Sequence, residues 1–281
     1  MTGLDGTLYL SDLDGTLLTP SAELTGYTVA ALNEMIRSGL AFTVATARTA
    51  ASVRPILAAL DLNVPLILMN GAQIYDHGTG RYLHAEYIGT DTVLQLTELL
   101  RMHGAAGFMY GLENDTLATY YERLDSEPLE DFMRERQTRY NKRFTQVERF
   151  SDYAGCGIQY FVLLDRRERL APVRDGLAAI PGLGNAFYPD IYREGYWFLE
   201  VFSDRVSKGN AARLLRSRFG YARLVGFGDH LNDLPLFDAC DEGYAVGNAH
   251  PDLAAAATGR IGSNTEDGVA RWLEHRFMKN V

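Results

Sequence analysis

Hydrophobic and polar positions follow a regular alternation along the first part of the chain. Continuously apolar runs predict short buried strands at Leu8–Ser11, Leu40–Ala45 and Pro65–Met69. Apolar residues at helical spacing predict helices between these strands at Thr25–Arg37 and Thr49–Leu60. Strands that alternate with helices of this length are typical of a parallel α/β sheet.

The pattern changes after Asn70 and Gly71 and returns at Ser207. The intervening segment predicts a hairpin, helices and aromatic strands at Ile74–Leu83, Thr90–Met102, Gly107–Leu112, Leu117–Tyr121, Glu127–Arg139, Ile158–Leu164, Arg166–Ala179, Phe187–Tyr188 and Tyr196–Phe202. Charges of alternating sign in Glu127–Arg143 favour a solvated helix face. This mixture indicates an α+β domain inserted into the first one.

After Ser207 the alternation of helix and strand resumes and should complete the sheet that Leu8–Ser11 begins. The expected elements are Lys208–Phe219, Ala222–Phe227, a helix from Leu231, Gly243–Val246 and Thr265–Arg276. We therefore predict an α/β core domain of residues 1–82 and 194–281, with an α+β cap domain of residues 83–193 inserted in it.

Composition limits the partners of this chain of 281 residues. Its formal net charge of −9 disfavours nucleic acid and anionic membranes, which bind clustered Lys and Arg. No apolar run approaches the ~20 residues of a membrane span, and no basic segment followed by an apolar stretch opens the sequence. The 2 cysteines are far apart and suit a reducing compartment. We expect a cytoplasmic protein, monomeric or a small homo-oligomer, that acts on a small molecule.

The segment Asp12–Thr16, with the sequence Asp-Leu-Asp-Gly-Thr, follows the first predicted strand. In extended backbone the side chains of Asp12 and Asp14 share a face, and the turn between them exposes N–H groups that can hold an anion. Paired carboxylates bind hard divalent cations, while one can attack as a nucleophile and the other can transfer protons. This combination suits phosphoryl transfer.

Two other interpretations of short acidic turns apply to this region. The partial copy at Leu4–Leu8, which includes Asp5, has Gly3 in place of the first acid, so we expect only an N-terminal turn there. A calcium-binding loop would use Asp12, Asp14 and Glu23, but Leu17 occupies the position that requires Gly.

Three further signals lie at predicted strand ends or helix starts. Thr46 could cap a helix, Lys208 opens a helix against the helix dipole, and Asp229 lies in a Gly-bounded turn with Asn232 and Asp233. Each alone has an ordinary structural explanation. Together they place a hydroxyl, an ammonium and a second acidic cluster where strand ends of an open α/β sheet face one crevice.

With these residues the chain resembles the haloacid dehalogenase superfamily, and specifically its Cof-type phosphatases with a large inserted cap. Asp12–Thr16 matches the first motif, Thr46 the second, Lys208 the third, and Asp229 with Asn232 and Asp233 the fourth. Three other segments resemble Cof-type sequences: Asn70–Ala72, Ala245–Ala249 and Glu266–Val269. Ala47 departs from the pattern, because the family commonly has Gly there; its backbone donor remains.

The resemblance implies a role for each matching residue. Asp12 would attack phosphorus, and Asp14 would protonate the leaving oxygen and then activate water. Mg²⁺ would bind Asp12, the backbone carbonyl of Asp14, and Asp229. The phosphate oxygens would be held by Thr46, Lys208, Asn232 and the N–H groups of Leu13 and Ala47. Asp233 would orient this cluster; Arg48 and Asn70 would face it or serve as structural hydrogen-bonders, and Asn248 is expected to be a turn residue.

The leading hypothesis is a Mg²⁺-dependent phosphatase of a small phosphorylated metabolite, a sugar or cofactor phosphate, that forms an aspartyl-phosphate. The alternatives are a phosphomutase or phosphotransferase with the same intermediate, and a catalytically silent binding protein. We expect the cap to close over the core and select the leaving group. Its candidate aromatic and cationic residues are Tyr110, Tyr121, Tyr188, Tyr192, Arg193, Tyr196 and Trp197.

Overall fold

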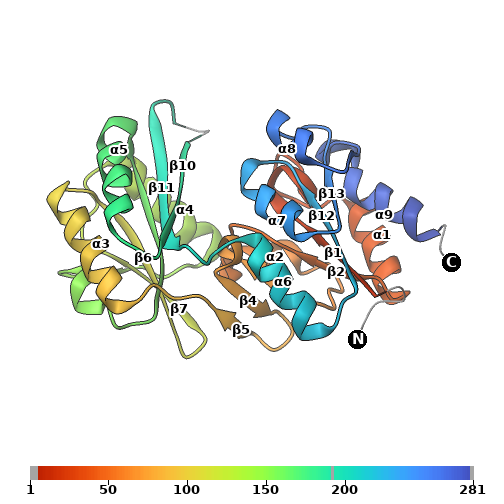
Figure 1. Cartoon of the computed structure of the whole chain (residues 1–281), viewed down its shortest axis with the longest axis horizontal. Helices are drawn as coiled ribbons and strands as arrows, with labels where there is room; N and C mark the ends of the chain where they lie inside the picture. Colours follow the sequence, from red (N-terminus) through yellow and green to blue (C-terminus); the bar gives the residue numbers. More distant parts are fainter. Residues whose placement is uncertain (1–5, 191–192, 279–281) are drawn as a thin grey trace. The chain divides into compact units, whose positions relative to one another are not determined.

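The computed structural model describes residues 6–190 and 193–278. Contacts within the chain divide it into two compact units (Figure 1). The core unit comprises Met1–His84 and Ser207–Val281, and the cap unit comprises Ala85–Val206. Asp5 and Tyr192, named above as an N-terminal turn residue and a cap candidate, lie outside the described residues.

A five-stranded parallel sheet forms the centre of the core unit. Its order is β14 (Gly259–Arg260), β13 (Glu242–Ala245), β12 (Arg223–Gly228), β1 (Thr7–Ser11) and β2 (Ala41–Val44). Strands from after the insertion thus complete the sheet that β1 begins, as predicted. Every residue of β1 is buried, which explains its continuous apolar run.

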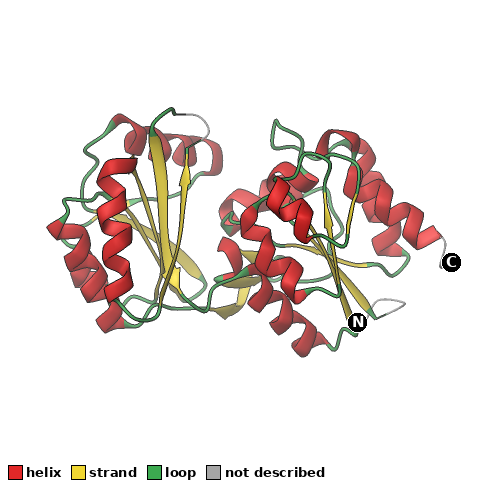
Figure 2. Cartoon of the chain, turned by 45° about the horizontal axis from the view of Figure 1, so that its top comes forward, coloured by secondary structure: helices red, strands yellow, loops and turns green. Residues whose placement is uncertain are grey.

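Helices cover both faces of this sheet (Figure 2). They are α1 (Gly26–Arg37), α2 (Ala50–Leu57), α6 (Lys208–Phe219), α7 (Leu234–Ala239), α8 (Pro251–Ala256) and α9 (Gly268–Met278). Successive residues of β1 point to opposite faces. Tyr9 therefore packs in one hydrophobic cluster with residues of α1, α2 and α9, while Leu8 and Leu10 pack in another with residues of α6 and α7.

The third predicted strand differs from the expectation of a parallel strand in this sheet. β3 (Leu66–Leu68) pairs antiparallel with β4 (Gln73–Asp76), and β5 (Arg81–Ala85) completes a separate three-stranded sheet. A single parallel bridge from Ala45 to Ile67 links β3 to the end of β2. The chain reverses after β3 because three successive residues, Met69–Gly71, have positive φ.

The cap unit is a six-stranded sheet with helices. The strand order is β10 (Leu183–Pro189), β11 (Tyr196–Ser203), β9 (Ile158–Arg166), β6 (Gly107–Glu113), β7 (Thr116–Tyr121) and β8 (Thr145–Gln146). α3 (Thr90–Met102) and α5 (Arg167–Gly176) share one hydrophobic cluster with β9. On the other face, Phe132 of α4 (Glu127–Tyr140) stacks on Phe108, with ring centroids 5.0 Å apart.

The second boundary of the insertion differs from the one predicted at residues 193 and 194. The cap unit continues to Val206, because β11 lies between β9 and β10 and pairs with both. Periodicity identifies β11 as a strand but not as an inner strand of the cap sheet.

Smaller differences from the expected elements concern the C-terminal part. The hydrophobic pattern does not predict α8, and the last helix begins at Gly268 because a separate turn, Asn264–Glu266, precedes it.

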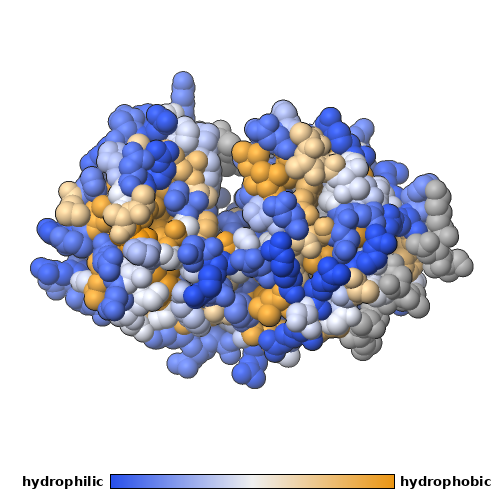
Figure 3. Space-filling model, viewed as in Figure 1, coloured by the Kyte–Doolittle hydropathy of each residue, from blue (hydrophilic) through white to orange (hydrophobic). Residues whose placement is uncertain are grey.

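Hydrophilic residues cover most of the face that Figure 3 shows, with hydrophobic ones interspersed. None of the helices that the structure describes is both long and apolar enough to cross a membrane.

Candidate active site

The strands β1, β2 and β12 lie in the core sheet (Figure 1). Their parallel register brings three predicted motifs to one edge of that sheet. Asp12 follows β1 and donates its N–H to the carbonyl of Phe227, at 2.9 Å. Ala45, just before Thr46, donates to Ser11 at 2.8 Å. The carboxyl ends of parallel strands form the usual ligand crevice of an open α/β sheet.

Lys208 connects Asp12 with Asp233. Its Nζ lies 2.5 Å from Oδ1 of Asp12 and 2.7 Å from Oδ1 of Asp233, and all three side chains are buried. Burial alone would lower the pKa of Lys208, but the two carboxylates outweigh it and raise that pKa. Burial raises the pKa of Asp12, opposed by Lys208. The lysine thus keeps its charge beside the proposed nucleophile.

Asp233 shapes the turn after β12. Its Oδ2 accepts the N–H groups of Asp229 and His230, at 3.0 and 3.2 Å, while Oδ1 faces Lys208. Both oxygens are therefore engaged within the protein. This supports the interpretation that Asp233 orients the cluster rather than binding metal directly.

Asp229 and Asp12 belong to the acidic cluster that could hold a metal ion. Among the described residues, Asp12, Asp229 and Asp233 can offer ligand oxygens that all lie within 4.8 Å of one another. Burial and the charge of Asp233 raise the pKa of Asp229 to about 6, although its Oδ1 accepts a 3.1 Å hydrogen bond from Thr16. Uncompensated negative charge and a donor set of oxygens alone fit Mg²⁺.

Asp14 lies beyond Asp12 in a turn that Gly15 enables with a φ of 77°. Arg48 donates to it from Nε at 2.7 Å and from Nη2 at 2.6 Å. The Asp14 side chain remains 53% exposed, so a substrate can reach it. The sequence placed Arg48 near this cluster but did not identify its partner.

The remaining phosphate-binding candidates also meet at this edge. Thr46 accepts the N–H of Arg48 at 3.2 Å on its hydroxyl and the N–H of Asn70 at 2.9 Å on its carbonyl. Asn232 donates to the side chain of Asn70 at 3.3 Å. Leu13 and Ala47 directly follow Asp12 and Thr46. Asn70 thus connects two motifs through hydrogen bonds, and the contacts with phosphate stay predictions.

Gly71, in the segment Asn70–Ala72, makes a close backbone contact with the start of α6. A Cβ at this position would lie 2.2 Å from the carbonyl oxygen of Ser207, the residue that caps α6. The close approach seats the start of α6, and with it Lys208, against the turn after β3.

The cap candidates that the structure describes belong to the cap unit. Tyr188 and Tyr160 donate to Glu200 at 2.8 and 2.7 Å. Lys142, which the sequence pattern did not single out, lies 4.2 Å from the ring centroid of Tyr110. Arg193 pairs with Asp131 and Asp190 at 3.3 and 3.2 Å, tying α4 to the segment after β10.

Comparisons with known proteins agree with this geometry. The family model of haloacid dehalogenase-like hydrolases matches residues 9–273. The chain is 27% identical to the pyridoxal phosphate phosphatase YbhA of Escherichia coli, over 93% of this chain and 95% of that protein. It is 26% identical to the HMP-PP phosphatase of Serratia proteamaculans, over 94% and 93%. A solved haloacid dehalogenase-like hydrolase of Bacteroides thetaiotaomicron has the same fold, with a TM-score of 0.79, 21% identity and coverage of 96% and 98%.

Proposed function

We propose, for a chain that belongs to the haloacid dehalogenase-like hydrolase family, a Mg²⁺-dependent phosphatase that hydrolyses a small phosphorylated metabolite through an aspartyl-phosphate. The observation that carries the proposal is the joint placement of Asp12, Asp14, Lys208 and Asp229 at one sheet edge. Two of the relatives are named a pyridoxal phosphate phosphatase and an HMP-PP phosphatase, which supports a small phosphorylated substrate.

In the proposed reaction an oxygen of Asp12 attacks phosphorus while the bond from phosphorus to the leaving oxygen breaks. Asp14 gives its proton to that oxygen, which leaves as an alcohol. Asp14 then takes a proton from water, which attacks the aspartyl-phosphate and releases phosphate and Asp12. The exposure of the Asp14 side chain leaves it accessible to the leaving oxygen in this scheme.

Positive charge has to offset repulsion between Asp12 and the substrate phosphate. Lys208 supplies one cation from within the chain. Mg²⁺, held by Asp12, the backbone carbonyl of Asp14 and Asp229, would supply the other when bound and polarise the phosphoryl group. Thr46, Asn232 and the N–H groups of Leu13 and Ala47 would hold the phosphoryl oxygens.

Assays with and without metal test the proposal. Purified protein with Mg²⁺ should release inorganic phosphate from members of a panel of phosphorylated metabolites, without any bisphosphate activator. Removal of bound metal with a chelator should abolish release, and excess Ca²⁺ should inhibit it, because Ca²⁺ tolerates bidentate carboxylates and can capture Asp12. Full activity in the chelator would contradict the metal role, and a need for a bisphosphate would indicate a mutase.

A further inference from the structure

Two segments that resemble the family, Ala245–Ala249 and Glu266–Val269, supply none of the groups in the proposed reaction. The structure connects both to the turn that follows Asp12. Asn248 donates from Nδ2 to the carbonyl of Gly15 at 2.8 Å, and its Oδ1 accepts the N–H of Asn264 at 3.1 Å. Asn264 donates from Nδ2 to the carbonyl of Leu18 at 2.8 Å. Two linked amides therefore hold the turn that contains Asp14 at its middle, Gly15, and at its last residue, Leu18.

The same turn is in close contact with Asp229. A Cβ on Gly15 would lie 2.2 Å from Oδ2 of Asp229, and Thr16 donates to its Oδ1 at 3.1 Å. The turn is closed by a hydrogen bond from Leu18 to Leu13, at 2.9 Å. A shift of the turn would therefore displace the proton-transferring residue and disturb a metal ligand together.

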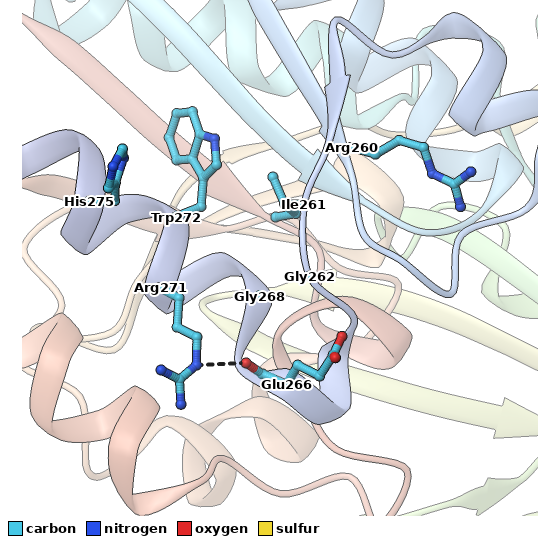
Figure 4. A pocket seen from close by; sticks show the side chains of 8 residues that line it. All are labelled: Arg260, Ile261, Gly262, Glu266, Gly268, Arg271, Trp272 and His275. Atoms are coloured by element: carbon cyan, nitrogen blue, oxygen red, sulfur yellow. Dashed lines mark hydrogen bonds between the residues drawn. The ribbon is translucent and has the colours of Figure 1, made fainter.

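Further contacts hold the turn Asn264–Glu266 in place. Glu266 accepts the N–H and the hydroxyl of Ser263, at 2.9 and 2.7 Å, which fixes the turn Asn264–Glu266. A Cβ on Gly268 would lie 1.9 Å from the carbonyl oxygen of Gly262, so the start of α9 rests directly on that backbone. Figure 4 shows Glu266 beside the two glycines, at a cavity of about 640 Å³.

We propose that Asn248 and Asn264 are positioning residues for phosphoryl transfer: they fix the turn Leu13–Leu18 so that Asp14 and Asp229 keep their places relative to Asp12. This inference rests on the proposed function. Asn248 is exposed, so its hydrogen bonds contribute little to the free energy of unfolding. A displacement of ~1 Å at reacting groups can nevertheless cost on the order of 100-fold in rate.

The chain contains a matched control for these asparagines. Asn33 also bridges two backbone groups in the core unit, donating to Ala59 and accepting from Asp61, both at 2.8 Å. None of the residues assigned to the reaction contacts Asn33 through these bonds. Asn33→Ala thus removes the same kind of bridge away from the turn.

The experiment compares Asn248→Ala, Asn248→Asp, Asn264→Ala and Asn33→Ala in the full chain. For an alkyl phosphate, which needs proton donation by Asp14, we expect kcat of Asn248→Ala to fall roughly 10- to 100-fold with a much smaller change in KM. Asn248→Asp should lose at least as much, because it keeps the acceptor for Asn264 but sets a carboxylate against the Gly15 carbonyl. Hydrogen exchange of the peptide spanning residues 13–18 should accelerate in all Asn248 and Asn264 variants.

Asn33→Ala should leave kcat and that peptide's exchange unchanged. Wild-type kcat in Asn248→Ala or Asn248→Asp, unchanged exchange at residues 13–18, or an equal loss of kcat in Asn33→Ala would overturn the positioning role. Absence of phosphate release by the wild-type protein would contradict the proposed function instead, while the exchange data would still show whether the two amides hold the turn.

Discussion

Lys208 neutralises part of the negative charge of two buried carboxylates, those of Asp12 and Asp233. It lies within 2.7 Å of carboxylate oxygens from both Asp12 and Asp233, and its side chain is completely buried. Two carboxylates at such positions repel each other and are poorly solvated, so removal of the cation leaves uncompensated buried charge. The stability of the fold and the state of the nucleophile both depend on this one residue.

We predict that Lys208→Met lowers the free energy of unfolding by about 3–5 kcal/mol and abolishes turnover. Mg²⁺ should recover part of the lost stability, because a cation bound to the folded site substitutes for the missing charge. Chemical denaturation with and without Mg²⁺ measures both effects. Arg213→Met, which removes an exposed cation from the same helix, is the control. Equal stability of Lys208→Met and the wild type would contradict this account.

The sequence located the polar and charged candidates at one sheet edge, but it did not identify their hydrogen-bond partners. Asp12, Thr46, Lys208 and Asp229 were identifiable because strand ends and helix starts can be located from periodicity, and their clustering at one edge follows from parallel pairing. The bidentate pair of Arg48 and Asp14 joins residues from different strand ends. Such a pair depends on the detailed backbone path of two turns, which residue patterns do not specify.

At the scale of elements, Gly71 couples the turn after β3 to the start of α6. Its φ of 102° is a value that residues other than glycine rarely adopt. A Cβ at this position would also lie 2.2 Å from the carbonyl oxygen of Ser207. The sequence indicated a break at Asn70 and Gly71, but the reversal into β4 comes from three successive residues of positive φ. The conformational propensities of individual residues predict such a run poorly, because positive φ is unfavourable for each residue other than glycine.

We predict that Gly71→Ala lowers stability by about 1–3 kcal/mol and also reduces kcat, because the start of α6 and Lys208 must shift. Gly220→Ala is the matched control at the other end of α6: its φ is 73°, but nothing lies within 4 Å of an added Cβ. It should lose stability and keep kcat. Unfolding curves and steady-state kinetics of both variants check the prediction, which an unchanged kcat in Gly71→Ala would refute.

The segment after α4 contains Lys142, whose positive charge lowers the stability of the folded protein. Burial and the neighbouring Arg136 lower the pKa of Lys142 from 10.5 to about 7. Since the folded pKa lies below the unfolded one, the protonated lysine destabilises the fold fully below pH 7, and this cost disappears as the pH rises from about 7 to 10.5.

Lys142→Met should therefore stabilise the protein more at pH 6 than at pH 10. Thermal unfolding of variant and wild type at several pH values measures the difference, and Arg143→Met, at the exposed neighbouring position, should give a difference that does not vary with pH. A Lys142→Met effect that is equal at both pH values would contradict the assigned burial.

For the whole molecule, we propose that the core unit carries out phosphoryl transfer and that the cap unit selects the leaving group. The sequence located the insertion through its change of rhythm, but not its second boundary, because only strand pairing shows that β11 belongs to the cap sheet. The cap unit contains aromatic rings, Lys142, and Glu200 with its hydrogen bonds from Tyr160 and Tyr188. We propose that this unit closes during turnover and selects the leaving group.

Variants in the cap unit should then change the ranking of substrates rather than the chemistry. Arg193→Ala, which releases Asp131 and Asp190 from their ion pairs, should reorder activities across a metabolite panel while hydrolysis of a small unselective ester persists. Lys208→Ala should lower all activities together. An unchanged ranking in several cap variants would contradict selection by this unit.

Asp12 is the nucleophile of the Mg²⁺-dependent phosphatase that we propose. The most direct measurement is phosphate release by the wild type, Asp12→Asn and Asp5→Asn with Mg²⁺, on the best substrate of the panel. We predict a loss of ~10⁴-fold or more in Asp12→Asn with an unchanged fold, and nearly wild-type activity in Asp5→Asn. Retention of more than a few per cent of activity in Asp12→Asn, on the order of 100 times the predicted remainder, would contradict it.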